Sequence, residues 1–274
     1  MSKTNPGHFF EDFRVGQELA HATPRTITAG DVALYTALYG PRFALQSSDA
    51  FARSLGLPGA PVDDLLVFHV VFGKTVPDVS LNAIANLGYA ECRFGVLVYP
   101  GDTLSARSTV LGLRETSNRE SGVVHVRSTG RNQHGEVVLD YVRWVMVRKR
   151  DPRAEVAAVS PPPLVPAVAA ADLVVPAGLS LGGYDTALAG APHRWGDYAV
   201  GERIDHVDGM TIEEAEHMMA TRLYQNTAKV HFDQRLAAGG RFGRRLIYGG
   251  HIISLARALS FNGLANAIRM AAIN

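Results

Sequence analysis

The sequence predicts an α+β fold in which an antiparallel sheet wraps around a central helix, and it predicts that this unit occurs twice. The run LeuLeuValPheHisValValPhe at 65–72 is apolar on every side, as expected of a helix enclosed by other structure. Four segments of strand character follow it directly. The opening part of the sequence also recurs weakly at a constant offset of 185 residues, which is the signature of an internal repeat.

Length and composition agree with this organisation. A chain of 274 residues predicts about two domains, and 47% hydrophobic with 19% charged residues is typical of globular proteins. The net charge of +1 excludes a general electrostatic attraction to nucleic acid or to an anionic membrane. One cysteine, Cys92, cannot form an intramolecular disulfide, and the N-terminal residues lack the apolar core of a signal peptide. We therefore expect a cytoplasmic protein with no membrane-spanning segment.

The elements of the first copy follow in order. Thr28 can cap a helix that begins near Asp31, and Gly40 with Pro41 would end it. Within the buried helix, His69 is predicted to be a hydrogen-bonded core histidine. The strands are predicted at 84–94, 103–113, 122–131 and 136–149, with turns at ProGlyAsp (100–102) and HisGlyGlu (134–136). A helix followed by such a meander predicts a curved sheet around that helix.

A stretch rich in Ala, Pro and Gly separates the two copies, so we expect three parts: 8–150, a linker at 151–192, and 193–274. The second copy repeats the opening strand region, a helix from Thr211 and a buried helix at 249–264. The image of the meander would run from 269 to about 335, whereas the sequence ends at Asn274. We therefore expect a second copy that is incomplete in this sequence, and a native chain longer by roughly 60 residues. The identities that keep the 185-residue offset are Asp12/Asp197, Gly16/Gly201, Thr26/Thr211, Ile27/Ile212, Leu38/Leu223 and Tyr39/Tyr224.

One motif of the linker has the form of a hydrolase nucleophile turn. GlyLeuSerLeuGly at 178–182 matches G-x-S-x-G, but no strand is predicted before it and several glycines follow it. Ser180 is therefore interpreted as a linker serine, with a serine hydrolase as a distant third reading. The sequence contains no Walker A motif, no H-E-x-x-H and no paired C-x-x-C.

The most informative segment is TyrGlnAsnThrAlaLysValHisPheAsp at 224–233, followed by IleTyrGlyGlyHis at 247–251. It resembles the signature of the MaoC-like dehydratases, the R-specific enoyl-CoA hydratase family, in which D-x-N-P-x-H precedes an I-x-x-G at the start of the hot-dog helix. The resemblance implies a double hot-dog fold. Its pairing of a degenerate and a functional copy is most similar to the mesaconyl-CoA hydratases, also called beta-methylmalyl-CoA dehydratases.

The resemblance also implies the roles of individual residues. His231 takes the place of the motif histidine, Gly249 that of the oxyanion-hole glycine, and Asn226 that of the catalytic aspartate. Gly250 and Tyr248 are assigned to substrate binding beside Gly249. The motif asparagine and proline are replaced by Ala228 and Lys229, and the first copy departs further, with Pro41, Gln46 and Asp64 at the aspartate, histidine and glycine positions.

The chemistry implied is the reversible dehydration of a 3-hydroxyacyl-CoA to its enoyl-CoA. His231 is suited to proton transfer near neutral pH, and a backbone N–H at Gly249 can stabilise a negative charge on the thioester oxygen. An amide such as Asn226 can orient a water or hydroxyl but cannot carry a proton. We expect neither a metal nor a redox cofactor, since coenzyme A enters as part of the substrate.

Several alternatives stay open at this point. The substrate is either beta-methylmalyl-CoA, giving mesaconyl-CoA, or a straight-chain acyl-CoA, and Asn226 also leaves room for a non-catalytic acyl-CoA-binding scaffold. Asp233 and Glu216 are candidates for the second proton. A homo-oligomer is a plausible expectation. The basic side chains nearest the motif, which could contact the nucleotide of coenzyme A or be ordinary surface residues, are Arg241, Arg244 and Arg245.

Overall fold

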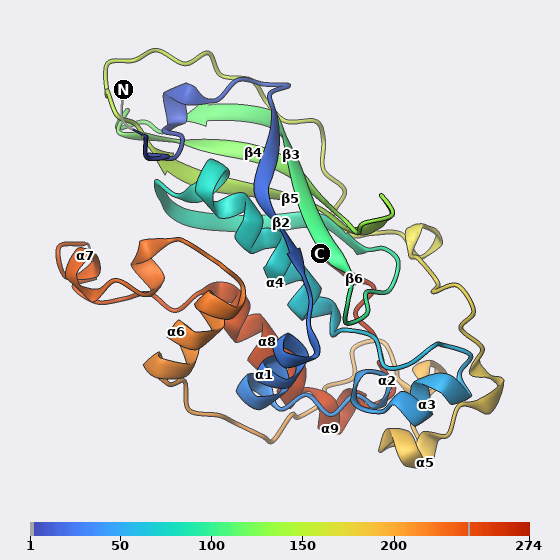
Figure 1. Ribbon diagram of the computed structural model, residues 1–274. Helices are drawn as coiled ribbons and strands as arrows, with labels where there is room; N and C mark the ends of the chain where they lie inside the picture. Colours follow the sequence, from blue (N-terminus) through green and yellow to red (C-terminus); the bar gives the residue numbers. More distant parts are fainter. Residues whose placement is uncertain (1–2, 241) are drawn as a thin grey trace.

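The computed structural model describes residues 3–240 and 242–274, and its largest feature is one antiparallel sheet curved around a helix (Figure 1). Within these residues the strand order is β1-β3-β4-β5-β2-β6. The bounds of the strands are β1 Glu18–Thr26, β2 Ala83–Phe94, β3 Thr103–Glu115, β4 Ser121–Arg131, β5 Val137–Arg148 and β6 Ala272–Ile273. The four predicted strands of the meander are confirmed, each to within two residues.

The central helix is α4, Asp64–Thr75, and all twelve of its residues are buried. It lies against the concave face of the sheet, where Gly130 of β4 approaches Val71 so closely that a Cβ would overlap it. Leu139, Tyr141 and Val145 of β5 are also fully buried on that side. The apolar run therefore forms a helix because the sheet covers it on one side and other helices cover it on the rest.

The preceding helix, α1 (Ala29–Tyr39), begins and ends as predicted. The Thr28 side chain accepts a hydrogen bond from the backbone N–H of Asp31, and the Asp31 carboxylate accepts one from the N–H of Thr28, so that they form a capping box. Gly40 follows in the left-handed conformation with φ of 59°, which favours glycine and ends the helix. Two short helices, α2 (Ala44–Ser47) and α3 (Asp49–Ser54), lead on to α4.

The second half repeats the first at the same offset of 185 residues. The 3-10 helix Phe10–Asp12 corresponds to Trp195–Asp197, and in each the final aspartate accepts a hydrogen bond from the backbone N–H three residues earlier. Helix α6 (Glu214–Leu223) is the image of α1, and α8 (Gly249–Leu259) is the image of α4. β6 lies where the image of β2 begins. The internal repeat inferred from a few identities therefore holds for the elements as well.

One element of the second copy was predicted wrongly. The opening strand region has no counterpart at 203–211, which carries no regular structure. In the first copy this strand, β1, pairs with β3 alone, and the image of β3 would lie beyond residue 274. A strand is stabilised by backbone hydrogen bonds to a neighbouring strand. Because no described strand lies beside this segment, the extended conformation is not stabilised there. Val207 within this segment and Val200 just before it are accordingly exposed.

Contacts between equivalent residues join the two halves. The Tyr224 hydroxyl donates to the Tyr39 hydroxyl at 2.6 Å, and a ring nitrogen of His69 lies 2.8 Å from the Ser254 hydroxyl. Both pairs are separated by 185 residues, so each links a position with its own image. His69 is buried and hydrogen-bonded, as predicted, although its partners lie on the second copy. The halves thus pack around a local two-fold axis that passes between α1 and α6 and between α4 and α8.

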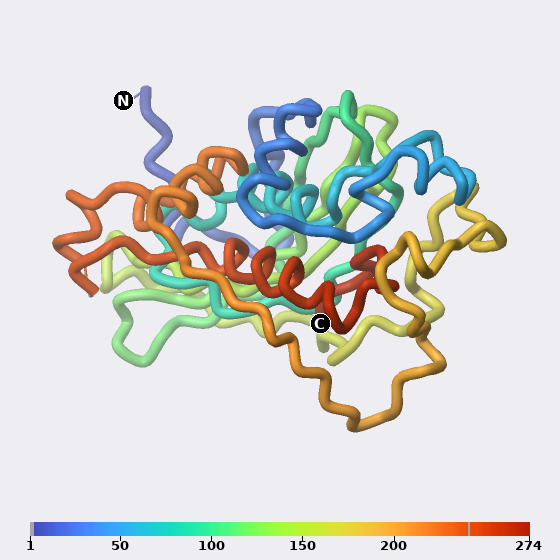
Figure 2. The backbone as a smooth tube through the Cα atoms, turned by 90° about the horizontal axis from the view of Figure 1, so that it is seen from below, coloured from blue at the N-terminus to red at the C-terminus, as the bar shows by residue number. Residues whose placement is uncertain are grey.

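The linker is draped over the outside of the first copy. Residues 151–192 contain only the short elements η3 (Ala170–Asp172), η4 (Leu181–Gly183) and α5 (Thr186–Ala189), and Val159 forms an isolated bridge with Leu113. Figure 2 follows the chain from this region into the long orange segment that leads to α6. Residues 160–179, which lead into Ser180, contain no strand, so the nucleophile turn is excluded and Ser180 is a linker serine as interpreted.

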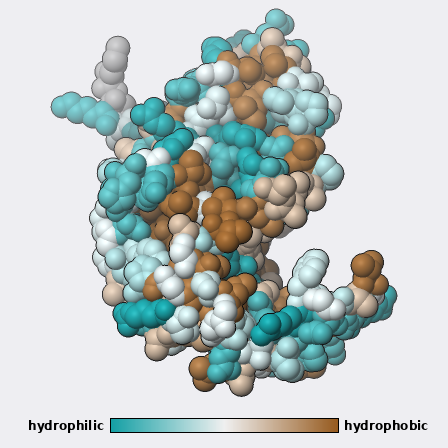
Figure 3. Space-filling model, turned by 90° about the vertical axis from the view of Figure 1, so that its right-hand side faces the viewer, coloured by the Kyte–Doolittle hydropathy of each residue, from teal (hydrophilic) through white to brown (hydrophobic). Residues whose placement is uncertain are grey.

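The surface has apolar side chains gathered beside a hollow on one face (Figure 3). Among the residues that the structure describes, no helix is long and apolar enough to cross a membrane.

Candidate active site

His231 lies at the end of the 3-10 helix η6, Lys229–His231. Its Nδ1 is 2.9 Å from the backbone carbonyl of Leu246, which can only accept, so Nδ1 carries the hydrogen and Nε2 keeps a free lone pair. The N–H of Leu246 donates in turn to the carbonyl of Val230, which ties the two segments together. Burial lowers the pKa of His231, against the opposing effect of its hydrogen bond to Leu246. A neutral imidazole with a free Nε2 is suited to accept a proton.

The start of α8 lies beside His231. Tyr248 is the N-cap of α8, and its ring centroid is 5.6 Å from that of His231. No side-chain cap occupies the first turn, so the N–H groups of this turn retain the partial positive charge of a helix N-terminus. Gly249 is exposed, and a Cβ there would meet nothing within 4 Å, whereas a Cβ at Gly250 would lie 2.5 Å from His69. Gly249 therefore faces open space, while Gly250 is needed for packing against α4.

Asn226 is buried next to the last turn of α4. Its backbone N–H donates to the carbonyl of Thr221, and its side-chain oxygen accepts from the N–H of Ala228. The side-chain nitrogen is buried with no hydrogen-bond partner among residues 3–240 and 242–274. Gly73 of α4 packs against the backbone of this segment, where a Cβ would lie 2.0 Å from the carbonyl oxygen of Tyr224 and 3.4 Å from the backbone nitrogen of Asn226. A buried amide with a free N–H is suited to bind an oxygen atom of a ligand.

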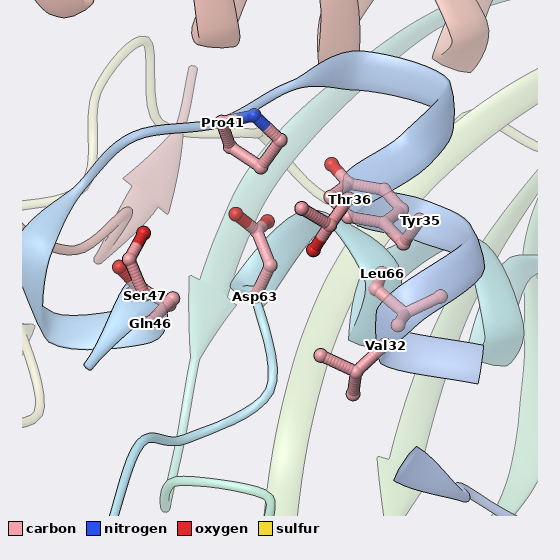
Figure 4. A pocket seen from close by; sticks show the side chains of 8 residues that line it. All are labelled: Val32, Tyr35, Thr36, Pro41, Gln46, Ser47, Asp63 and Leu66. Carbon is pink, nitrogen blue, oxygen red and sulfur yellow. The ribbon is translucent and has the colours of Figure 1, made fainter. Parts of the chain in front are cut away.

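In the first copy, Pro41 and Gln46, at the aspartate and histidine positions, line a cavity of about 270 Å³ (Figure 4). Gln46 donates to the carbonyl of Ile268 at 2.9 Å, and Asp64 accepts from the N–H of Met270 and pairs with Arg269. The two residues at the histidine and glycine positions therefore hold the segment that leads into β6. Burial raises the pKa of Asp64 to about 7. A carboxylate here offers no donor for an oxyanion.

The internal repeat relates the residues that line this cavity to equivalent residues in the second copy. Its walls include Val32, Pro41, Gln46, Asp63 and Leu66. Their images at the 185-residue offset are His217, Asn226, His231, Tyr248 and His251. The internal symmetry that relates α1 to α6 and α4 to α8 therefore puts Asn226, His231 and Tyr248 at positions equivalent to the walls of this cavity, and the rings of His231 and Tyr248 lie 5.6 Å apart.

Two histidines of this set were missed by the sequence analysis. The ring of His217 lies 5.8 Å from that of His231 and 5.6 Å from that of His251. His217 accepts the backbone N–H of Tyr248 at 2.7 Å, and burial lowers its pKa to about 4, so it is a neutral acceptor that fixes the start of α8. The spacing of His217 and His251 along their helices matches no motif, and only their shared neighbours reveal them.

His251 is held by a chain of hydroxyl groups. Tyr224 donates to Tyr39, and the Tyr39 hydroxyl lies 2.9 Å from Nδ1 of His251. This order makes Tyr39 the donor to Nδ1, so Nε2 of the neutral ring carries the hydrogen. Nε2 is buried and has no partner within the described part of the chain. Together with Asn226, it supplies a second unpaired donor to the site.

The other candidates have different positions. The Asp233 carboxylate accepts from the N–H of Leu236 and caps a short helix, α7 (Gln234–Ala238), and Glu216 is exposed on α6. Arg245 is paired with Glu214, Arg244 is exposed, and Arg241 lies outside the described residues.

A half-buried imidazole beside a helix N-terminus, with two unpaired donors nearby, defines a site for proton transfer next to a carbonyl. The fold carrying it is that of the double hot-dog, MaoC-like dehydratases. A crystal structure of a MaoC domain dehydratase from Chloroflexus aurantiacus is 67% identical, with a TM-score of 0.97, over all of this chain and 78% of that one. A Mycobacterium tuberculosis protein with a double hot-dog fold is 27% identical, with a TM-score of 0.71, over 97% of this chain and 79% of that one.

The particular family follows from the sequence comparisons. The model of the mesaconyl-CoA hydratase family matches residues 2–263. The beta-methylmalyl-CoA dehydratase of Chloroflexus aurantiacus is 67% identical over 273 residues, covering 100% of this chain and 78% of the relative. The mesaconyl-CoA hydratase of Cereibacter sphaeroides is 67% identical over 272 residues, covering 99% and 78%. The chain belongs to the mesaconyl-CoA hydratase family.

Proposed function

We propose that this protein is a hydro-lyase that interconverts beta-methylmalyl-CoA and mesaconyl-CoA. The observation that carries the proposal is the free Nε2 of His231 beside the start of α8, in a chain 67% identical to two relatives that bear these names. A straight-chain acyl-CoA is the runner-up substrate. We also propose an acyl-CoA thioester as its ligand, with no metal or redox cofactor, because loss of water changes no oxidation state. A cytoplasmic location and self-association remain predictions.

The mechanism that fits these residues uses one imidazole for both proton transfers. Nε2 of His231 takes the proton from the carbon next to the thioester carbonyl, and negative charge passes to the thioester oxygen. The N–H of Gly249, at the positive end of α8, stabilises that oxygen, and one such donor contributes on the order of 10² to 10³-fold in rate. His231 then returns the proton to the leaving hydroxyl, which departs as water.

Asn226 and His251 hold the hydroxyl in this scheme. Both present N–H groups that are buried and unpaired within the described residues, so each can donate to an oxygen. An asparagine cannot carry a proton, and Asp233 and Glu216 are placed elsewhere, which is why we assign both transfers to His231. His217 acts on Tyr248 and is a positioning residue.

The test is to follow the absorbance of the enoyl thioester when the enzyme is mixed with mesaconyl-CoA and, separately, with crotonyl-CoA. Faster turnover of mesaconyl-CoA is expected. Turnover of crotonyl-CoA alone would support the straight-chain reading. Tight binding of both thioesters without turnover would contradict an enzymatic role and support an acyl-CoA-binding scaffold.

A further inference from the structure

Arg143 interrupts an otherwise apolar surface. It lies on β5, between Tyr141 and Val145, and shares their side of the strand, which faces α4. Its side chain is completely buried. Arginine is almost never fully buried without a charged or polar partner, so this position requires an explanation.

The contacts of Arg143 satisfy only part of its guanidinium. Nη2 donates to the Thr75 hydroxyl at 2.7 Å and lies 3.4 Å from the Ser80 hydroxyl, and Cζ is 4.4 Å from the centroid of the Phe72 ring. Nε and Nη1 are buried without a hydrogen-bond partner, and no carboxylate lies within 4 Å among residues 3–240 and 242–274. The protein thus buries a positive charge and provides no negative charge for it.

Such an arrangement is costly unless a ligand completes it. Burying an unpaired charge costs several kcal/mol, and the cost falls when an anion with matching acceptors arrives. A guanidinium donates strong, charge-assisted hydrogen bonds to a carboxylate, and the unpaired Nε and Nη1, which lie on opposite sides of Cδ, can each donate one. A carboxylate is therefore the kind of group that would satisfy this side chain.

Arg143 contacts the last turn of α4, which also contacts the candidate active site. Phe72, under the guanidinium, has its ring centroid 5.4 Å from that of Tyr248, the residue before Gly249. Gly73 is packed against Asn226, and Thr75 binds Arg143, so the last turn of α4 contacts both. Lys74, between them, is also buried and donates to Gln225. Lys74 in α4 and Arg143 packed against its last turn therefore place two buried basic side chains at this end of the helix.

We propose that Arg143 binds the free carboxylate of a dicarboxylic acyl thioester whose reacting carbons lie beside His231 and Gly249. The acyl group would run along Phe72 and Tyr248. This inference rests on the proposed function and adds the residue that selects a charged acyl group over a neutral one. It also explains a neutral Asn226, because an aspartate there would face the substrate's own negative charge.

The test compares Arg143→Met with Arg148→Met, which makes the same change at an exposed position of the same strand. For Arg143→Met, kcat/KM for mesaconyl-CoA should fall by about 10²-fold or more, as expected when one partner of a buried charge pair is lost. The value for crotonyl-CoA, which has no carboxylate, should change by less than about threefold. Arg148→Met should leave both values unchanged. An equal loss on both substrates in a folded Arg143→Met protein would mean that Arg143 is only structural.

A second measurement uses unreactive ligands and a milder variant. Succinyl-CoA and butyryl-CoA differ by the carboxylate, and the wild-type enzyme should be inhibited by succinyl-CoA at a concentration at least about tenfold lower. Arg143→Lys keeps a positive charge but lacks the planar guanidinium with its fixed Nε and Nη1 donors, so this preference should shrink severalfold. An unchanged preference would overturn the proposal. Failure of the proposed function would differ, since wild-type enzyme would then leave mesaconyl-CoA unreacted.

Discussion

A single hydrogen bond at His231 determines how the site should respond to pH. The Leu246 carbonyl fixes the hydrogen on Nδ1, and burial lowers the pKa of the ring, so the proton-accepting form should persist below pH 6.5. We predict that the acidic limb of kcat/KM lies below pH 6.5 and that His231→Ala lowers kcat by at least about 10²-fold. A pH series with the wild type and circular dichroism of the variant test this. Near-full turnover by a folded His231→Ala protein would remove this residue from the mechanism.

The neutral side chain of Asn226 is open to a second test. Asn226→Asp keeps the oxygen that accepts from Ala228 but replaces the free N–H with a negative charge. Repulsion from an acyl carboxylate about 4 Å away would cost ~1 to 4 kcal/mol, depending on the effective dielectric. We predict that kcat/KM shifts toward crotonyl-CoA and away from mesaconyl-CoA, with Asn226→Ala slow on both. An unchanged ratio on one enzyme preparation would argue against selection by charge.

The sequence predicts some residues of the site and not others for a physical reason. His231, Asn226 and Gly249 lie within one short segment, and their spacing is set by a loop and a helix start, so a linear motif describes them. His217, His251 and Arg143 depend on neighbours far away in the chain, at Tyr248, Tyr39 and Thr75. The sequence shows Arg143 as a charged residue within a largely apolar strand. It does not show that the buried guanidinium has no carboxylate beside it among the described residues.

The two glycines at the start of α8 should behave differently when each is replaced. Gly250→Ala places a Cβ 2.4 Å from the Tyr248 ring and 2.5 Å from His69, so we expect a loss of stability of ~1 to 3 kcal/mol. Gly249→Ala adds a methyl group to open space and should leave the melting temperature unchanged while reducing turnover, if substrate approaches the N–H there. Thermal melts of both variants test this. Equal melting temperatures would show that α4 and α8 do not pack as described.

The first copy should tolerate changes that the second does not. Gln46 holds the carbonyl of Ile268, so Gln46→Ala should cost about 0.5 to 1.5 kcal/mol of stability and leave turnover nearly unchanged. Denaturant titration together with kcat measures both quantities. A collapse of kcat in a folded Gln46→Ala protein would show that the first copy takes part in catalysis and that the active site has been assigned to the wrong copy.

The extent to which elements could be predicted also has a physical cause. The strands of the first meander were predicted because partners on both sides enforce the alternation of buried and exposed residues. The segment 203–211 resembles β1 in sequence, but a strand is a property of a pair, and here no described strand lies beside it. Helices α6 and α8 form from their own sequence, whereas the segment 203–211 would need a neighbouring strand to become one.

The molecule as a whole buries several neutral histidines, and this should limit its stability in acid. Burial lowers the pKa of His69 to about 3 and that of His217 to about 4. The unfolded chain binds protons near pH 6.5 and the folded one does not, so stability is complete above that pH and is lost as pH falls. For His69 alone the loss at pH 5 is about 2 kcal/mol.

Urea titrations at pH 7 and pH 5 test this, with His134→Ala, a change at an exposed histidine, as the control. His69→Phe should weaken the dependence on pH, whereas His134→Ala should retain it. A midpoint that is the same at both pH values in the wild type would contradict the prediction.

The hydroxyl pair of Tyr39 and Tyr224 has a consequence for how this molecule can change over time. In an association of two identical subunits, a residue on the symmetry axis meets its own copy, and every substitution is made twice. Within one polypeptide the two positions mutate separately. His69 now faces Ser254, and Pro41 with Gln46 stands where Asn226 and His231 stand in the other half, while the tyrosine pair is still symmetric. Covalent linkage thus lets the two halves acquire different residues at equivalent positions, because neither half can be exchanged for another copy of the other.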